Sequence, residues 1–122
     1  MEWDGSEDCR VYVIGPLQTG GDMITGTKNA VDMGTVLANI GYIPFIPHLS
    51  SFWHYLHPAE PAFWLKQDFA WLRVCHAVLR LPGASNGGDK EEALARSLGI
   101  PVFRSVEELN AWKSSKALPQ VA

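Results

Sequence analysis

RVYVIGP, residues 10–16, is the stretch that decides the fold class of this chain. Its β-branched and aromatic side chains form a short, mostly apolar run that stops at Gly-Pro. Such a run, bounded by turn residues, is typical of a strand buried on both faces of a parallel sheet. We therefore expect a buried first strand over residues 10–15, followed by a tight turn.

Beyond this strand, short apolar runs alternate with stretches of helical periodicity. Further strands are expected at residues 42–47, 77–83 and 101–103, the first of them at an edge because it contains prolines. Helices are expected at residues 25–40, 61–74, 90–98 and 105–113, and a long loop at residues 47–60. The alternation predicts one α/β domain: a doubly wound parallel sheet of flavodoxin-like order 2-1-3-4 with helices on both faces. Ligands of such sheets bind beyond the carboxyl ends of the strands.

Composition and charge restrict the classes of function. With 122 residues, of which 47% are hydrophobic, the chain can bury a core as a single domain, which we place at residues 10–113. Residues 1–9 and 114–122 are expected to form a flexible leader and a flexible tail. The net charge of −3 argues against long nucleic acid as a partner, and no stretch indicates a signal peptide or membrane span. We therefore expect a cytoplasmic protein without a membrane partner, and no cofactor is indicated.

Two glycine-containing loops follow predicted strands. In IGPLQTGGD, residues 14–22, Gly15, Gly20 and Gly21 would let the backbone approach a sugar or phosphate closely, and Pro16 is a candidate binding residue beside them. A tight strand-to-helix turn explains Gly15 and Pro16 about as well. The first loop is therefore a candidate binding segment rather than a diagnostic motif.

The second loop, LPGASNGGDKEE at residues 81–92, precedes a predicted helix. Ser85, Gly87 and Gly88 stand where free amides at a helix N-terminus bind anions. Glu91 is expected in the first turn of that helix, where it could simply offset the helix dipole. Two glycines and a serine in front of a carboxylate exceed what a dipole correction needs, so Glu91 is a candidate functional residue.

Asp68 is a candidate because of its neighbours on the predicted helix. Trp64, Asp68, Trp71 and Cys75 follow one another at helical spacing, so Asp68 lies on an otherwise aromatic and apolar stripe. A carboxylate there is costly unless it is paired or has a function. The alternative is that this stripe faces a partner or solvent.

The segment PHLSSFWHYLHP, residues 47–58, is dense in aromatic residues and histidines. The aromatic residues and the three histidines of this segment could stack on a base and hydrogen-bond its edge, or the segment could form an oligomer interface. These residues are Phe52, Trp53, Tyr55, His48, His54 and His57. The spacing of His48, His54 and His57 fits no standard zinc pattern, so we expect no metal site.

Together these residues resemble the nucleoside 2-deoxyribosyltransferase superfamily, in particular its short nucleotide N-glycosidase and phage-type branches. Tyr12 in VYVIGP is similar to the tyrosine of the family's opening strand, and Asp68 to its helical aspartate. Ser85 and Glu91 match its serine and its nucleophilic glutamate, and the glycines between them match as well. The resemblance spans residues 10–112. It departs at Cys75-His76, where members usually have Cys-Asp or Asn-Asp.

The resemblance implies cleavage or transfer of the N-glycosidic bond of a nucleoside or its 5′-monophosphate. Glu91 would be the nucleophile, Asp68 the acid that protonates the base, and Tyr12 the group that orients Glu91 through a hydrogen bond. Whether water or a second base resolves the intermediate, making the enzyme a hydrolase or a transferase, stays open.

The resemblance also implies a binding site. Ser85 matches the serine that contacts the 5′-phosphate in the nucleotide-cleaving members, so Ser85 and the amides of Gly87 and Gly88 would hold this phosphate. The transferase branch usually carries an aspartate where Ser85 stands, which favours a nucleotide as the substrate. Trp53 and His48 would face the base. Members of the family pair through the second helix, and the exposed aromatic content of residues 52–64 agrees with a homodimer.

Two other classes of function stay open. The chain could be a catalytically silent nucleotide-binding module of the same fold. It could also be a flavodoxin-like or Toll-interleukin-receptor-like domain that acts through protein contacts or on NAD, because fold alone does not establish catalysis.

Overall fold

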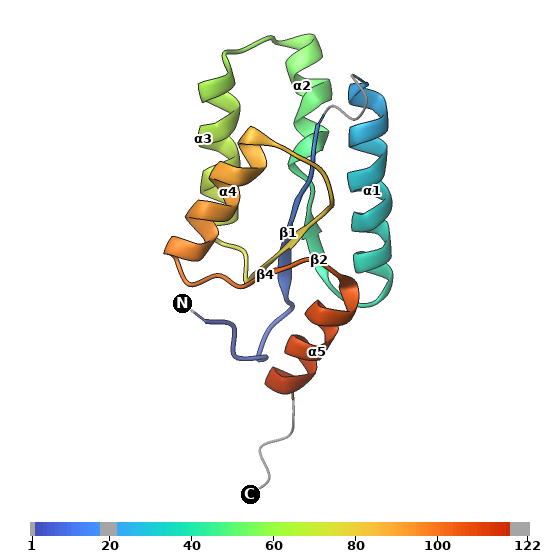
Figure 1. The fold of residues 1–122 in the computed structure, drawn as a ribbon, viewed down its shortest axis with the longest axis vertical. Coiled ribbons are helices and arrows are strands. Elements are labelled where there is room, and N and C mark those ends of the chain that lie inside the picture. Colours follow the sequence, from blue (N-terminus) through green and yellow to red (C-terminus); the bar gives the residue numbers. More distant parts are fainter. Residues whose placement is uncertain (1, 18–21, 118–122) are drawn as a thin grey trace, which may run out of the picture.

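A four-stranded, all-parallel sheet forms the centre of the molecule (Figure 1). The computed structural model describes residues 2–17 and 22–117. The strands are β1 (Arg10–Ile14), β2 (Ile43–Phe45), β3 (Ala77–Arg80) and β4 (Val102–Phe103), in the order β2-β1-β3-β4. This confirms the predicted order 2-1-3-4 and the edge position of the proline-containing β2. Pro44 lacks a backbone N–H, which an edge strand tolerates because one of its sides is unpaired.

Helices cover both faces of the sheet, as expected for a doubly wound fold. On one face lie α1 (Met23–Asn39) and α5 (Val106–Ala117), and on the other α3 (Pro61–Leu72) and α4 (Asn86–Ser97). A 3-10 turn, η1 (Pro47–Leu49), leads into α2 (Ser50–Leu56), which lies beyond the carboxyl ends of the strands, at the top of Figure 1. None of the helices in the described part of the chain is both long and apolar enough to cross a bilayer.

Side-chain alternation along β1 separates two hydrophobic cores. Val11 and Val13 pack toward α1 and α5, whereas Tyr12 and Ile14 pack toward α3 and α4. All four side chains are fully buried, and burial of an aliphatic side chain of this size contributes about 1.5–3 kcal/mol. The strand period of two therefore places the Tyr12 hydroxyl in the layer that holds α3 and α4.

The helix α4 begins earlier than the sequence predicts. We expected its start at Lys90, but it starts at Asn86 because Ser85 caps it. The Ser85 Oγ accepts a hydrogen bond from the Gly88 N–H at 2.9 Å, and this cap offsets the low helix propensity of the two glycines. Glu91 therefore lies in the second turn, so stabilisation by the helix dipole does not explain its position.

Two further boundaries differ from the expectations. Residues 47–60 are not a loop throughout, because η1 and α2 occupy residues 47–56. The prediction was wrong because α2 has no buried residue, so its apolar side chains form no stripe facing the core. The last helix continues to Ala117, so the predicted tail begins inside it.

The segment before β1 packs against the domain, which corrects the expectation of a flexible leader at residues 1–9. Residues 2–9 form no helix or strand, but Trp3 is only 5% exposed. Its Nε1 donates to the Glu7 carbonyl at 2.9 Å, and its ring lies 5.2 Å from that of Trp112 in α5. The segment is therefore part of the packed molecule.

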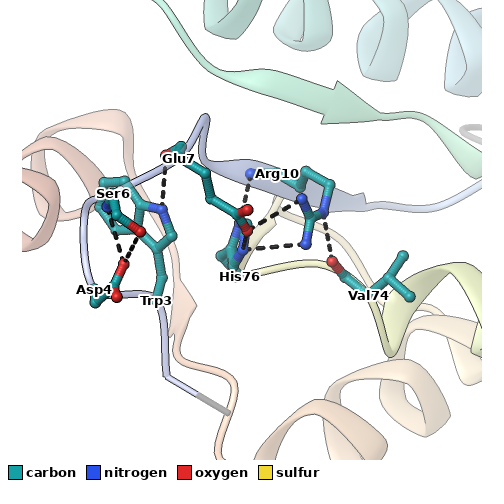
Figure 2. A network of polar contacts seen from close by, with 7 residues as sticks. All are labelled: Trp3, Asp4, Ser6, Glu7, Arg10, Val74 and His76. Atoms are coloured by element: carbon teal, nitrogen blue, oxygen red, sulfur yellow. Dashed lines mark hydrogen bonds and ion pairs between the residues drawn. The ribbon is translucent and has the colours of Figure 1, made fainter.

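His76 ties this segment to the amino ends of β1 and β3 (Figure 2). Its Nδ1 accepts the backbone N–H of Arg10 at 2.9 Å, and its Nε2 donates to Glu7 Oε1 at 2.8 Å. The Arg10 Nε donates to the Val74 carbonyl at 2.6 Å. Burial lowers the pKa of His76, and Arg10 lowers it further, although Glu7 opposes them. The neutral ring, with its single proton on Nε2, is thus the form that fits this network.

Candidate active site

Tyr12 and Glu91 meet between the sheet and α4. The Tyr12 hydroxyl donates a hydrogen bond to Glu91 Oε2, which confirms the predicted contact. Tyr12 is fully buried and Glu91 is 8% exposed. A buried carboxyl group lowers stability unless its surroundings favour it, so this position is typical of a functional residue.

The neighbouring carboxylate, Glu92, belongs to a different cluster. It pairs with Arg80, Arg96 and Arg104 at 2.9 to 3.1 Å. Burial disfavours its ionisation, but hydrogen bonds from these arginines outweigh burial and lower the pKa of Glu92 to about 2. Glu92 is therefore a fixed anion in an ion-pair network, and Glu91 is the carboxyl group that faces Tyr12.

Asp68 completes the group from α3. Burial raises the pKa of Asp68 to about 6. Burial also raises the pKa of Glu91 to about 7; the hydrogen bond from Tyr12 lowers it and the charge of Asp68 raises it. The Tyr12 hydroxyl stays protonated, because burial and the charges of the same carboxylates raise its pKa. The Asp68 charge therefore acts on both Tyr12 and Glu91, and the raised pKa values bring the ionisation of both carboxyl groups closer to neutral pH.

A cavity of about 860 Å³ lies where α2, α3 and the start of α4 converge, and Asp68 is on its wall. This volume suits a small organic ligand. Apolar residues make up much of the lining, and Asp68 and Lys90 are the acidic and the basic residue among the described ones. The lining residues are Leu17, Met23, Ser50, Ser51, His54, Ala59, Pro61, Ala62, Trp64, Leu65, Asp68, Gly87 and Lys90.

The residues expected to face the base are not the ones on this wall. Trp53 is 48% exposed and packs edge-on against Phe63 and Trp64, with ring centroids 5.7 and 5.0 Å away. His48 is buried, and its Nε2 donates to the Gly15 carbonyl at 2.8 Å. Trp64 and the histidine at position 54 line the cavity instead, which corrects the predicted pair.

The structure places the residues of the predicted phosphate site differently from one another. Gly87 lines the cavity, and a Cβ there would meet no atom within 4 Å. The Gly88 amide, in contrast, already donates to the capping Ser85, and a Cβ on Gly88 would lie 2.9 Å from Ile14 Cγ2. Gly88 therefore serves helix-to-strand packing, which corrects its assignment as a free amide, while the Ser85 hydroxyl hydrogen remains available.

Gly15 and Pro16 of the first glycine loop are not among the residues that line this cavity, although Leu17 is. Gly15 accepts the hydrogen bond from His48, and Pro16 lines a separate cavity of about 630 Å³ between α1 and the loop after β3. Gly20 lies outside the described residues. In the part of the chain that the structure describes, no group of three or more His, Cys, Asp or Glu residues could hold a metal ion.

The sequence did not indicate Trp64 or Lys90 as site residues, and among the three histidines of residues 47–58 it led to His48 rather than His54. Trp64 stands four residues before Asp68, so the helical stripe already placed it on the same face. Lys90 directly precedes Glu91 and lies three residues after Gly87, which places it beside that glycine on one helix face. His54 carried no such spacing, because the helix that contains it was not predicted.

Comparisons with known proteins add no relative. No family model matches the chain, and neither a curated protein nor a solved structure is detectably similar to it. The functional interpretation therefore rests on the contact between Tyr12 and Glu91 and on the cavity that Asp68 lines, whose lining does not include Tyr12 or Glu91.

Proposed function

We propose that this protein cleaves or exchanges the N-glycosidic bond of a small nucleoside or nucleotide. The observation that supports it is a buried Glu91 carboxylate, held by the Tyr12 hydroxyl and coupled to the carboxyl group of Asp68 beside a ligand-sized cavity. Cleavage of an N-glycoside passes through an oxocarbenium-like sugar. Such a reaction needs one carboxylate near the anomeric carbon and a second group that protonates the departing base.

In the proposed mechanism Glu91 attacks the anomeric carbon while the bond to the base nitrogen breaks. Asp68 delivers its proton to the base, which leaves neutral, and the sugar stays bound to Glu91 as an ester. Water or a second base then displaces Glu91, and Asp68 takes up the proton that this acceptor loses. Positive charge developing on the sugar lowers the pKa of Glu91, which favours the ionised carboxylate that attacks. Tyr12 keeps the ionised Glu91 in position.

The surroundings of the cavity favour an anionic substrate, and we propose a nucleoside 5′-monophosphate. Lys90 and Gly87 line the cavity at the start of α4. A lysine ammonium attracts phosphate as a point charge, and the positive end of the helix dipole adds to this attraction. Ser85 at the same helix end can donate its hydroxyl hydrogen.

The deciding experiment is a panel of nucleosides and their 5′-monophosphates, scored for release of free base with and without an acceptor base. We expect turnover of monophosphates, and a loss of more than about 1,000-fold in kcat for Glu91→Gln. Glu92→Gln is the matched control, because Glu92 is adjacent in sequence but faces the arginine cluster, and it should retain kcat. Absence of turnover for every substrate would leave a silent binding module. Unchanged activity of Glu91→Gln would refute the mechanism.

We further propose a homodimer formed through the aromatic surface of α2 and the start of α3. Phe52 and Tyr55 are 68% and 78% exposed, and Trp53 and Phe63 are also solvent-facing. Exposed aromatic residues in such a group are typical of an interaction surface. Light scattering should give twice the chain mass at micromolar concentration, and Tyr55→Glu should shift it toward the monomer. A monomer mass for the wild-type protein would reject the dimer.

A further inference from the structure

His54 is held by two donors that converge on one ring nitrogen. Its Nδ1 accepts the indole N–H of Trp64 at 2.8 Å and the backbone N–H of Ala59 at 3.2 Å. The His54 and Trp64 rings are nearly perpendicular, with centroids 5.6 Å apart. These contacts join α2 to the connection that follows it and to α3, so the position of the imidazole is well determined.

The two donors also determine the tautomer of His54. A nitrogen that accepts two N–H groups carries no proton of its own, so the ring proton lies on Nε2. Among the described residues no hydrogen-bond partner is found for this Nε2–H. The atom is also not among the buried polar atoms without a partner, so it is accessible to solvent. His54 thus has an accessible donor, fixed in direction, on a side chain that lines the cavity.

This donor lies on the same cavity wall as the proposed acid. Trp64 and Asp68 are one helical turn apart in α3, and both line the cavity together with His54. A group protonated by Asp68 would lie within this cavity, whose lining also includes the indole and the imidazole. Joining α2 to α3 requires only the Nδ1 side of the ring, so the tie between these helices does not explain the free Nε2–H.

We propose that His54 is a specificity-determining residue that recognises the leaving base. Its Nε2–H donates to a ring nitrogen or carbonyl oxygen of a heteroaromatic base, while Trp64 supplies an apolar wall. The inference rests on the proposed function in one respect, namely that the occupant of the cavity is a nucleobase. His54 transfers no proton in this role: Asp68 protonates the base and His54 orients it.

Two substitutions separate the two nitrogens of the ring. His54→Asn places an amide oxygen near the former Nδ1, so it keeps the acceptor for Trp64 and Ala59 but removes the distal donor. His54→Gln places an amide nitrogen near the former Nε2, so it keeps the donor and loses the acceptor. Comparing the two variants distinguishes base recognition from a purely structural role, which Nδ1 alone would serve.

The experiment measures binding of free bases to the whole protein by calorimetry. The base that binds most tightly to the wild-type protein is compared with analogues that each lack one ring nitrogen or carbonyl oxygen. We expect one analogue to bind about 10- to 100-fold more weakly, because it leaves the donor unpaired. His54→Asn should weaken binding of the parent base by a similar factor, and it should not weaken binding of that analogue any further. His54→Gln should keep the difference in affinity between the parent base and the analogue.

The outcomes separate this inference from the proposed function. The role of His54 would be overturned if the affinity loss caused by His54→Asn multiplied the loss caused by every base analogue. It would also be overturned if no base bound measurably. Turnover of the corresponding nucleosides and 5′-monophosphates is measured in parallel. Binding that follows the expected pattern without turnover would leave His54 as a base-recognition residue and refute the catalytic proposal. Turnover with multiplying losses would do the reverse.

Discussion

Replacing Glu91 with glutamine should stabilise the protein at neutral and alkaline pH. The folded state raises the pKa of Glu91 from its usual 4.5 to about 7, mainly through burial. Above that pH the folded protein carries a buried anion that the unfolded chain exposes to water. A pKa difference of about 2.5 corresponds to about 3 kcal/mol of lost stability, at 1.36 kcal/mol for each pKa unit. Glutamine keeps an acceptor for the Tyr12 hydroxyl and does not ionise.

The sign of the pH dependence follows from the raised pKa. The contribution of Glu91 is fully present below about pH 4.5 and is lost as the pH rises through about 7, because the unfolded chain gives up its proton first. Glu91→Gln lacks this loss. The two proteins should therefore have similar stability near pH 4.5, and the variant should be more stable by up to about 3 kcal/mol at pH 8, or roughly 10 °C in Tm.

Urea unfolding of both proteins across this pH range measures the difference directly. Glu92→Gln is the control, because the pKa of Glu92 is lowered to about 2 and its stabilising contribution is present above the usual 4.5. That variant should be less stable than the wild type at pH 8, the opposite sign. A Glu91→Gln variant that is less stable at pH 8, or whose difference from the wild type is independent of pH, would refute the buried ionisable Glu91.

Three further perturbations test other parts of the structure. Tyr12→Phe removes a hydrogen bond that lowers the pKa of Glu91, so that pKa, followed by NMR titration, should rise; an unchanged value would contradict the contact. His76→Asn keeps an acceptor for the Arg10 N–H but cannot be protonated. Because the pKa of His76 is lowered on folding, the wild type should lose stability as the pH falls below about 6.5 and this variant should lose less. Gly26→Ala would place a Cβ against the backbone of the loop after β1 and should lower stability by about 1–3 kcal/mol in thermal unfolding, and an unchanged Tm would argue against that packing.

The layers of the fold and the three catalytic candidates could be predicted from the sequence because they depend on local patterns. The apolar run of β1 and the prolines of β2 report burial and edge position without knowledge of the partners. The period of 3.6 placed Asp68 among aromatic residues, whereas Tyr12 was identified through the family resemblance of the first strand. Glu91 was identified from the residues before it, although its helix starts earlier than expected.

The walls of the cavity could not be predicted, because they depend on contacts between segments far apart in the chain. His54 and His48 are both histidines in one aromatic-rich stretch, and the sequence offers no reason to prefer either. The orientation of α2, which has no buried residue, comes from a few contacts such as the bond between His54 and Trp64. The same holds for His76, whose ring is held by atoms of Glu7 and Arg10.

The sequence by itself predicted the order of the strands, helices on both faces of the sheet, and Asp68 and Glu91 as candidates, whereas Tyr12 became a candidate only through the family resemblance. Hydrophobic burial is non-directional and follows the periodicity of the chain, so these features can be predicted from the pattern of residues along the sequence. The tertiary structure alone decided that His54 rather than His48 lines the cavity and that residues 2–9 pack onto the domain. Hydrogen bonds and pKa values depend on distances of a few ångströms between residues distant in sequence, and only the packed molecule sets those distances.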